Sequence, residues 1–264
     1  MNLLLKVSFL FMSLFGFTQV EVSSLSLLET NVKLFEVNKL NQIYVVKGDN
    51  SISKFQDGQL VITRNLKVEG ELHHIDASNF FNILLFYKDL NSIISADNLL
   101  NLRSSLDFNN NDYLGSKQIS AVARSFDNKI WVFDIISQRL LKIDAIGKIL
   151  LESTALPNQI KLTNVHHIIE SAPYVFLLDS QQVLKMNIYG KIISSHTFPS
   201  AIERGYVYQD SICIQTLDSI YKESKEKTVV SPVAKRGVDS FGIWEETSMG
   251  ILFLQNDSLF LQQK

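Results

Sequence analysis

"KIWVFDIISQRLLKID", residues 129–144, runs from one apolar block through a polar elbow into a second apolar block. Two short apolar runs separated by a few polar residues predict a β-hairpin. The same pattern recurs more faintly at 42–55, 82–96, 173–186, 211–223 and 250–262. A pattern that repeats along a whole chain decides the fold more firmly than any single copy of it.

The hairpins are regularly spaced. Their apolar blocks begin at Ile43, Ile83, Ile130, Val175, Ile212 and Ile251, about 40 residues apart. Additional strands follow the hairpins, the weakest being "KTVVS" at 227–231. Four short strands in every ~40 residues are the signature of a β-propeller blade. We therefore expect an all-β, six-bladed β-propeller, since the rival arrangement, a β-sandwich followed by another β domain, does not explain the period.

The two ends of the chain complement each other. The sequence stops after the sixth hairpin, which leaves the sixth blade one outer strand short, while "VEVSSLSLLET" at 20–30 precedes the first inner strand and belongs to no blade. An unpaired strand edge invites aggregation. We therefore expect the N-terminal segment to complete the last blade and close the ring.

One hairpin carries a recognisable repeat. Ile130 to Asp134, followed by Arg139 to Asp144, resembles the NHL repeat, in which a strand ends in Asp and, after a four-residue elbow, a second strand opens with Arg. Asp179 keeps the strand-ending acid in the next hairpin, and the other copies keep only the rhythm. Across residues 19–264 the chain is similar to six-bladed NHL and TolB-like propellers, as a degenerate, exported member of bacterial type. This resemblance implies a fold, because such propellers bind proteins, RNA or sugars and some are enzymes.

The first 18 residues have the features of a secretory signal peptide. Lys6 precedes an apolar run at 7–17, and the small residues Gly16 and Thr18 stand two apart before the expected cleavage point. The run is far shorter than the ~20 residues of a membrane-spanning helix. We expect residues 1–18 to be removed and residues 19–264 to form a single domain, periplasmic or secreted, without a membrane span.

Charge and cysteine content narrow the possible partners. The formal net charge is −2 and no basic field is present, which argues against nucleic acid as a partner. The single cysteine, Cys213, stands in the apolar stretch "ICIQ", where a buried, inert thiol is expected.

Two histidine pairs and several acids are candidates for the lining of the central channel, and we expect the paired histidines to be structural. The pairs His73–His74 and His166–His167 fall in innermost strands of blades 2 and 4, where side chains alternate, so only one of each pair points a given way. Packing between blades is the simpler interpretation, and a channel-lining role is the alternative. Zinc needs three or four ligands, so we expect no metal and no other cofactor. The candidate channel residues are His73, His74, His166, His167, Glu36, Glu203, Glu245 and Glu246.

A polar loop is the second candidate site. "DFNNNDYLG" at 107–115 places oxygen-bearing side chains at Asp107, Asn109 and Asn111. A calcium loop of EF-hand type needs Gly at its sixth position and Glu at its twelfth, where this chain has Asp112 and Gln118. We therefore predict a solvated binding loop between blades 2 and 3, which lies beside the second long crossover at 154–163. We expect that the tip of this binding loop, residues 108–112, can be shortened at little cost in stability.

No hydrolase, nucleotide-binding, metalloprotease or thioredoxin motif occurs, and we name no catalytic residue. The sequence favours a non-catalytic interaction or scaffold module whose partner is another protein of the cell envelope. The alternative is a metal-assisted hydrolase or lactonase with its site at the central channel. Glycan binding is a third possibility, for which Trp131 and Trp244 are poor candidates because both stand in apolar strands.

Overall fold

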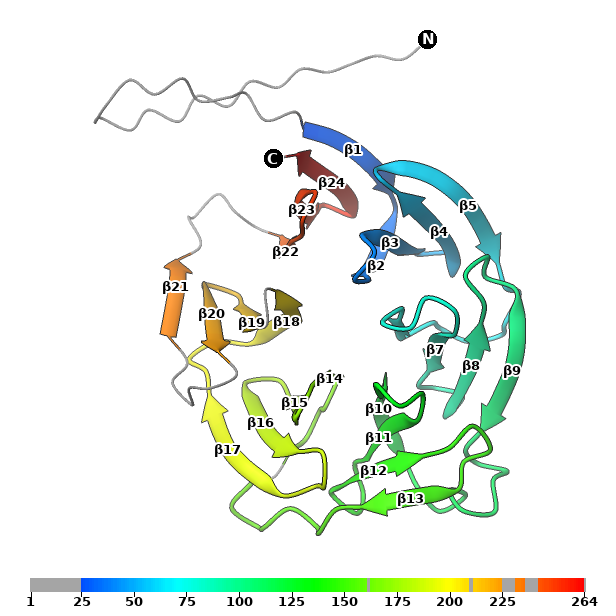
Figure 1. Cartoon of the computed structure of the whole chain (residues 1–264), viewed down its shortest axis with the longest axis vertical. Helices are drawn as coiled ribbons and strands as arrows, with labels where there is room; N and C mark the ends of the chain where they lie inside the picture. The colour runs from blue at the N-terminus through cyan, green and yellow to red at the C-terminus, as the bar shows by residue number, and fades with distance from the viewer. Residues whose placement is uncertain (1–24, 161, 209–210, 225–230, 236–241, 264) are drawn as a thin grey trace.

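The fold is a six-bladed β-propeller, as the repeat predicted (Figure 1). The computed structural model describes residues 25–160, 162–208, 211–224, 231–235 and 242–263, which contain strands and turns but no helix. Six four-stranded antiparallel sheets stand around a central channel. The predicted signal peptide, residues 1–18, lies outside the described residues.

Each blade runs from an inner strand beside the channel to an outer strand at the rim. Blade 1 consists of β2 (Val32–Val37), β3 (Gln42–Lys47), β4 (Ser51–Gln56) and β5 (Gln59–Asn65). Blade 2 consists of β6 (His74–Asp76), β7 (Ile83–Tyr87), β8 (Ser92–Ala96) and β9 (Leu102–Asp107). Blade 3 consists of β10 (Ile119–Arg124), β11 (Ile130–Asp134), β12 (Arg139–Ile143) and β13 (Ile149–Glu152). Blade 4 consists of β14 (His167–Ser171), β15 (Tyr174–Leu178), β16 (Gln182–Asn187) and β17 (Ile192–Thr197).

The last two blades also have four strands each, and one strand of blade 6 comes from a distant part of the chain. Blade 5 consists of β18 (Ile202–Tyr208), β19 (Ser211–Thr216), β20 (Ser219–Ser224) and β21 (Ser231–Lys235). Blade 6 consists of β22 (Ile243–Glu246), β23 (Gly250–Gln255), β24 (Ser258–Gln263) and β1 (Leu25–Thr30). The outer strand of blade 6 thus comes from the start of the chain.

The ring closes as predicted from the two chain ends. Strand β1 pairs antiparallel with β24, from Leu25 opposite Gln262 to Thr30 opposite Ser258. Figure 1 shows β1 along the outside of β24, next to blade 1, into which the chain then continues. The N-terminal segment therefore covers the edge that β24 would otherwise expose.

The predicted outer strand of blade 5, at 227–231, falls mostly outside the described residues, which omit 225–230. The described part of this outer strand is β21 (Ser231–Lys235), which pairs with β20.

The turns before the outer strands of blades 2, 3 and 4 share one hydrogen-bond pattern. An Asp or Asn at the first position accepts hydrogen bonds from the backbone N–H groups two and four residues later, at 2.9–3.0 Å. Such side chains stabilise turns because they replace a backbone acceptor. The three residues are Asp97, Asp144 and Asn187.

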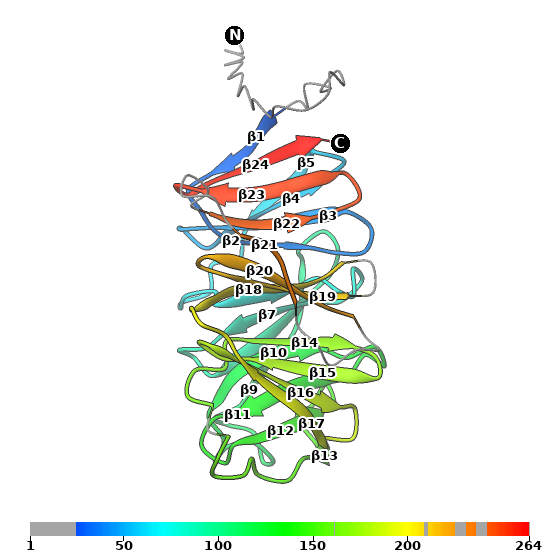
Figure 2. The same cartoon turned by 90° about the vertical axis from the view of Figure 1, so that its left-hand side faces the viewer.

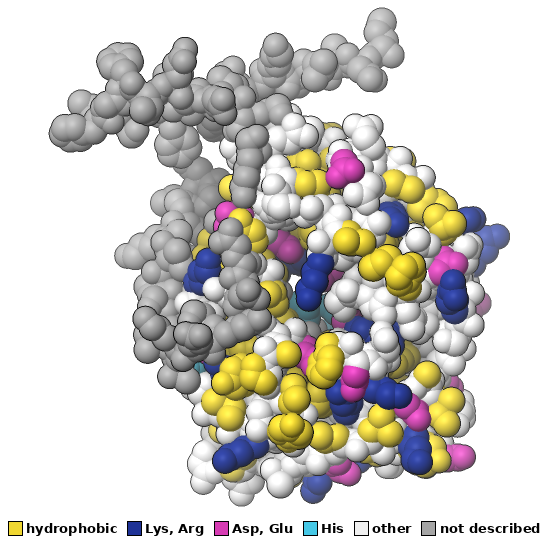
Figure 3. Space-filling view, in the orientation of Figure 1, with side chains coloured by type: hydrophobic (Ala, Val, Ile, Leu, Met, Phe, Trp, Pro, Cys, Tyr) yellow, Lys and Arg dark blue, Asp and Glu magenta, His cyan; other side chains and the backbone are white. Residues whose placement is uncertain are grey.

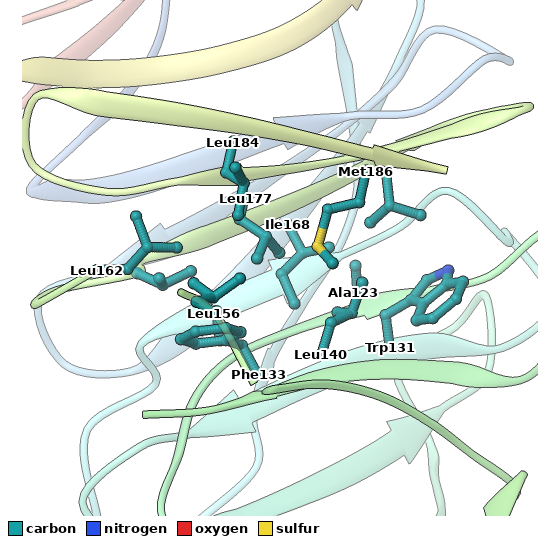
Figure 4. Close-up of a cluster of buried hydrophobic side chains, with 13 residues drawn as sticks. Ala123, Trp131, Phe133, Leu140, Leu156, Leu162, Ile168, Leu177, Leu184 and Met186 are labelled. Carbon is teal, nitrogen blue, oxygen red and sulfur yellow. The ribbon is translucent and has the colours of Figure 1, made fainter. Parts of the chain in front are cut away.

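The apolar core lies between neighbouring blades. Between blades 3 and 4, one cluster of buried apolar side chains includes Trp131, Phe133, Leu177 and Leu184, all fully buried (Figure 4). The edge-on view shows the blades stacked side by side with their strands crossing the thickness of the ring (Figure 2). Each blade therefore depends on its neighbours for the burial of its two faces.

Single residues also connect the blades. The ammonium of Lys185 on β16 lies 2.7 Å from a carboxylate oxygen of Glu223 on β20, and both side chains are almost fully buried. Cys213 on β19 is buried, as predicted, and burial raises the pKa of its thiol. In the described residues no helix has the length and apolar character needed to cross a membrane.

Candidate functional site in the central channel

The channel is divided into two cavities that share part of their walls. The larger has a volume of about 380 Å³ and lies towards the ends of the inner strands. The smaller, about 210 Å³, lies towards their beginnings. Glu36, His74 and His167 line both. In Figure 3 the centre of the ring is hollowed, with histidine atoms visible inside it.

An arginine that the sequence analysis did not name holds the middle of the channel. Arg204, on β18, donates from Nε to Glu245 Oε2 at 3.0 Å and from Nη1 to the carbonyl oxygen of Phe35 at 2.9 Å. Its Nη2 lies 3.5 Å from Glu36 Oε2. Burial alone would lower the pKa of Arg204, but the charges of Glu245 and Glu36 outweigh it and raise that pKa. One guanidinium thus connects blades 5, 6 and 1.

The two acids beside Arg204 are incompletely compensated. Burial raises the pKa of Glu36 well above its usual 4.5, and Arg204 offsets this effect only in part. The carboxylates of Glu245 and Asp76 raise the pKa of Glu36 further. Burial also raises the pKa of Glu245 despite its bond to Arg204. Burial in the channel therefore favours the protonated form of both carboxyl groups, and Arg204 counteracts this effect only in part.

The two histidine pairs are split by strand alternation, as the sequence suggested. His74 and His167 meet inside the channel with ring centres 4.8 Å apart, although one belongs to blade 2 and the other to blade 4. Burial lowers the pKa of His74 to about 4 and that of His167 well below 6.5, so both rings are neutral at pH 7. His73 and His166 line only the smaller cavity, and burial lowers their pKa values as well.

The predicted acids also lie at the channel. Glu36 and Glu245 contact Arg204, Glu246 lines the larger cavity, and Glu203 lines the smaller one. Within the described ranges, no three His, Cys, Asp or Glu side chains come together in an arrangement that could hold a metal ion. The alternative of a metal-assisted hydrolase thus has no ligand set among these residues.

The predicted binding loop is the crossover from β9 to β10, and its polar side chains hold the loop together. Asp107 Oδ1 accepts the N–H of Asn109 at 2.9 Å, and Asn109 Oδ1 accepts the side-chain amide of Asn91. Asn111 donates to the carbonyl oxygen of Ile146 at 2.8 Å, while Asp112 is exposed. Ligand-binding oxygens are thus largely occupied by the loop's own contacts.

The long crossovers are anchored in the core. Phe108 and Leu114 of the first crossover are fully buried, and so is Leu162 of the second. The prediction that residues 108–112 can be shortened at little cost was wrong for Phe108, because its removal would open a cavity. The two crossovers border one cavity of about 420 Å³, lined by Lys88, Asp89, Asn91, Asn109, Lys117, Gln118, Ile119, Ser120, Ile135, Thr163 and Asn164.

Sequence reasoning missed Arg204, Asp76 and Glu170 as channel residues. Arg204 stands next to Glu203 in an inner strand that has a register shift between Ile202 and Arg204. Arg204 contacts the carboxylates of Glu36 and Glu245. Strand alternation in the sequence could have named Arg204, but it could not show the bulge. Of the two tryptophans, Trp131 is fully buried, and the side chain of Trp244 lies outside the described residues.

The fold is shared with several solved structures at low sequence identity. The sequence matches no protein-family model and no curated protein sequence. A streptogramin B lyase structure aligns with a TM-score of 0.62 and 14% identity over 91% of this chain and 88% of that one. A catalytically inactive virginiamycin B lyase from Staphylococcus aureus, solved with quinupristin, aligns at 0.60 and 15% over 91% and 88%.

A third similar structure is an extracellular domain. The extracellular domain of the hybrid two component system BT4673 from B. thetaiotaomicron aligns with a TM-score of 0.59 and 13% identity, over 89% of this chain and 38% of that one. Identities this low show a common fold and carry no activity across. The chain shares the six-bladed β-propeller fold with these structures.

Proposed function

We propose that this chain is an exported, non-catalytic binding module that engages another protein of the cell envelope through its two long crossovers. The observation that carries the proposal is the 420 Å³ cavity bordered by both crossovers. Its volume lies in the range of ordinary ligand sites. Loops held by a rigid scaffold are where propellers and similar folds place binding residues.

The crossovers are rigid enough to present a fixed surface. Asp179 accepts the backbone N–H of Thr163 at 3.1 Å, and Gln138 accepts that of Leu162 at 3.1 Å. Lys117 lies 3.7 Å from the buried carboxylate of Asp134. A preorganised surface loses little entropy on binding, which favours recognition of a partner.

Site-specific photo-crosslinking in the native host tests the proposal. A benzophenone amino acid at Thr163 or Asp112, both exposed at the crossovers, is expected to give a discrete cross-linked band in the envelope fraction. The same residue at Leu60, exposed on the outer strand β5, is the control and should give none. The purified protein should hydrolyse neither lactones nor phosphoesters, with or without added divalent ions.

Three results would overturn the proposal. Cross-links of equal yield at Leu60 and Thr163 would show no preferred surface. Retention of the full-length precursor in the cytoplasm would contradict export. Turnover of a lactone or phosphoester would move the function to the channel.

A further inference from the structure

Three turns on one face of the propeller each present an exposed apolar side chain. Strands β2, β6 and β10 each end in a turn to the second strand of their blade, and these turns lie on the face opposite the crossovers (Figure 2). We call the three turns, at 38–41, 77–82 and 125–129, the mouth turns. They stand at the end of the larger channel cavity, whose lining includes Lys39 and Ser78. The proposed function uses the crossovers and gives this face no role.

The tips of the mouth turns are large apolar residues. Leu40 is 47% exposed, Phe81 is 65% exposed and Phe126 is 69% exposed. The ring of Phe81 lies against that of Phe80, with centres 3.9 Å apart. A single exposed apolar side chain is ordinary, but three on neighbouring turns of one face indicate an interaction surface.

Hydrogen bonds fix the backbone of each apolar tip. In all three mouth turns a side-chain oxygen accepts the backbone N–H of the tip residue, at 2.9–3.0 Å. The side chain of Asn79 also donates to Asn128 Oδ1 at 2.5 Å, which joins the second turn to the third. The tips are thus held in place before a partner binds, so binding costs little conformational entropy. The three acceptors are Asn38, Asn79 and Glu170.

Lysines accompany the apolar tips. Lys39 is exposed on the first mouth turn and Lys129 is half-buried on the third, and neither forms an ion pair with a described residue. Asp127, the acid of these turns, lies 2.7 Å from Lys142 Nζ, which also stands 5.2 Å from the ring centre of Phe126. With Lys142 included, the mouth turns therefore carry three cations and one acid, although the formal net charge of the chain is −2.

Separate apolar tips beside lysines suit the surface of a lipid bilayer. The tips belong to three different blades and have polar residues between them, so they do not form the continuous apolar core that protein interfaces bury. Acyl chains are fluid and can close around each tip separately. Phe and Leu side chains enter the boundary between headgroups and acyl chains, and lysines are attracted to anionic headgroups.

We propose that the mouth turns dock the protein on a bilayer surface that carries anionic phospholipids. Leu40, Phe81 and Phe126 enter the boundary between headgroups and acyl chains, while Lys39 and Lys129 contact the phosphates. The propeller then lies flat on the bilayer with its crossovers directed away from the lipid. Docking is thus compatible with a protein partner at the crossovers and does not depend on one.

Co-sedimentation with vesicles tests the docking. The chain without residues 1–18 retains every described residue and lacks the apolar run at 7–17, which could itself insert into lipid. It is mixed with vesicles of phosphatidylcholine alone, or of phosphatidylcholine and phosphatidylglycerol in equal parts. We expect tighter binding to the anionic vesicles, and weaker binding as salt is raised, because salt screens the attraction between lysines and headgroups.

Two paired variants separate the apolar contribution from the charged one. Phe81→Ser with Phe126→Ser should weaken binding to anionic vesicles by about tenfold or more, since two aromatic rings no longer enter the lipid. Lys39→Gln with Lys129→Gln should weaken the same binding by about tenfold and leave binding to neutral vesicles unchanged. All four side chains stand on turns outside the apolar clusters, so melting should be nearly unchanged.

Matched controls alter similar residues elsewhere on the surface. Leu60→Ser with Leu217→Ser removes two leucines that are more than half exposed, one on the outer strand β5 and one on the turn between β19 and β20, on the crossover face. Lys67→Gln removes an exposed charge from the connection between blades 1 and 2. Both controls should bind vesicles as the wild type does.

Loss of binding in both paired variants, with both controls at wild-type affinity, supports docking by the mouth turns. No binding to anionic vesicles, equal binding to both kinds of vesicle, or wild-type affinity in the aromatic pair overturns it. A dimer in sedimentation velocity without vesicles, abolished in the aromatic pair, assigns the face to a second copy of the chain and also overturns it. Cross-linking at the crossovers is measured separately, so the proposed function and the docking can fail independently.

Discussion

Two aspartates, one in blade 3 and one in blade 4, connect the best-preserved hairpins to the crossovers beside them. Asp134 is buried and accepts the backbone N–H groups of Gln118 and Ile136, each at 3.2 Å. Asp179 occupies the same place in blade 4 and accepts the N–H groups of Thr163 and Asn164. Each carboxylate thus ties the end of a crossover to its blade. The acid of the repeat is a structural ligand for backbone amides.

The channel histidines should make stability depend on pH. The pKa of His74 falls from 6.5 in the unfolded chain to about 4 in the folded one, so between these values the unfolded chain binds more protons. Stability should fall as pH drops from 6.5 towards 4, by up to ~1.4 kcal/mol per pH unit for each such histidine. Urea unfolding of the wild type and of His74→Gln over this range measures the effect.

The acids of the channel act in the opposite sense. Because the pKa values of Glu36 and Glu245 are raised on folding, these acids contribute stability that is lost as pH rises through their folded pKa values. The dependence of wild-type stability on pH therefore does not by itself reveal the effect of the histidine. The difference in slope between wild type and His74→Gln isolates the histidine. His196→Gln, on the outer strand β17, controls for loss of a histidine outside the channel. If the stability of wild type and of His74→Gln changed with pH in parallel, the lowered pKa of His74 would be contradicted.

Strand β23 depends on a glycine at its start. Gly250 has φ of +146°, and a Cβ there would lie 2.0 Å from the backbone oxygen of Gln262 on β24. Backbone cannot move aside as a side-chain tip can, so Gly250→Ala should destabilise the protein by about 3 kcal/mol or more. Gly58→Ala is the matched control, since Gly58 has φ of +75° but its nearest neighbour would be 3.7 Å away.

Gly58→Ala should cost only the ~1–2 kcal/mol of a left-handed backbone. Urea denaturation of both variants measures the two losses. Similar losses for both would show that backbone conformation, and not the close approach to β24, determines the effect.

The hairpins were predictable because each is specified locally. Apolar alternation and turn residues encode a strand pair within about 15 residues, and strands β3, β7, β11, β15, β19 and β23 begin at or within two residues of the apolar blocks. Local signals were therefore sufficient to predict the hairpins.

The channel was predictable only in part. Strand alternation placed one histidine of each pair in the larger cavity, yet nothing in the sequence indicated that His74 and His167 would meet across blade 3. The role of Arg204 depends on carboxylates about 41 and 168 residues away in the chain, and such long-range pairing leaves no local pattern.

At the scale of the whole molecule, stability depends on closure of the ring. Five apolar clusters of described residues lie between or within neighbouring blades, and the one at blades 6 and 1 includes Phe35, Leu252 and Leu261 with Leu28 packed against it. A repeat protein whose units are each marginal becomes cooperative when every interface is formed. The interface that closes the ring requires β1, which comes from the other end of the chain.

Removal of β1 should therefore open the ring. A chain that begins at residue 32 loses the pairs of β1 with β24 and the packing of Leu28, and exposes the edge of β24. Compared with a chain that begins at residue 25, we expect a loss of about 3 kcal/mol or more, and each kcal/mol lowers Tm by ~2–4 °C in a chain of this size. The melting transition should also broaden, since blade 6 can then unfold by itself.

A peptide that spans residues 25–31 supplies the control. Added in excess to the shortened chain, it should restore the sharp transition in a concentration-dependent manner, because a ligand that binds only the folded state raises Tm by mass action. A version with Leu28→Asp places a charge against the core cluster and should restore much less. If the shortened chain melts at the same temperature and with the same sharpness as the longer one, blade 6 is stable with three strands and closure by β1 contributes nothing to the ring.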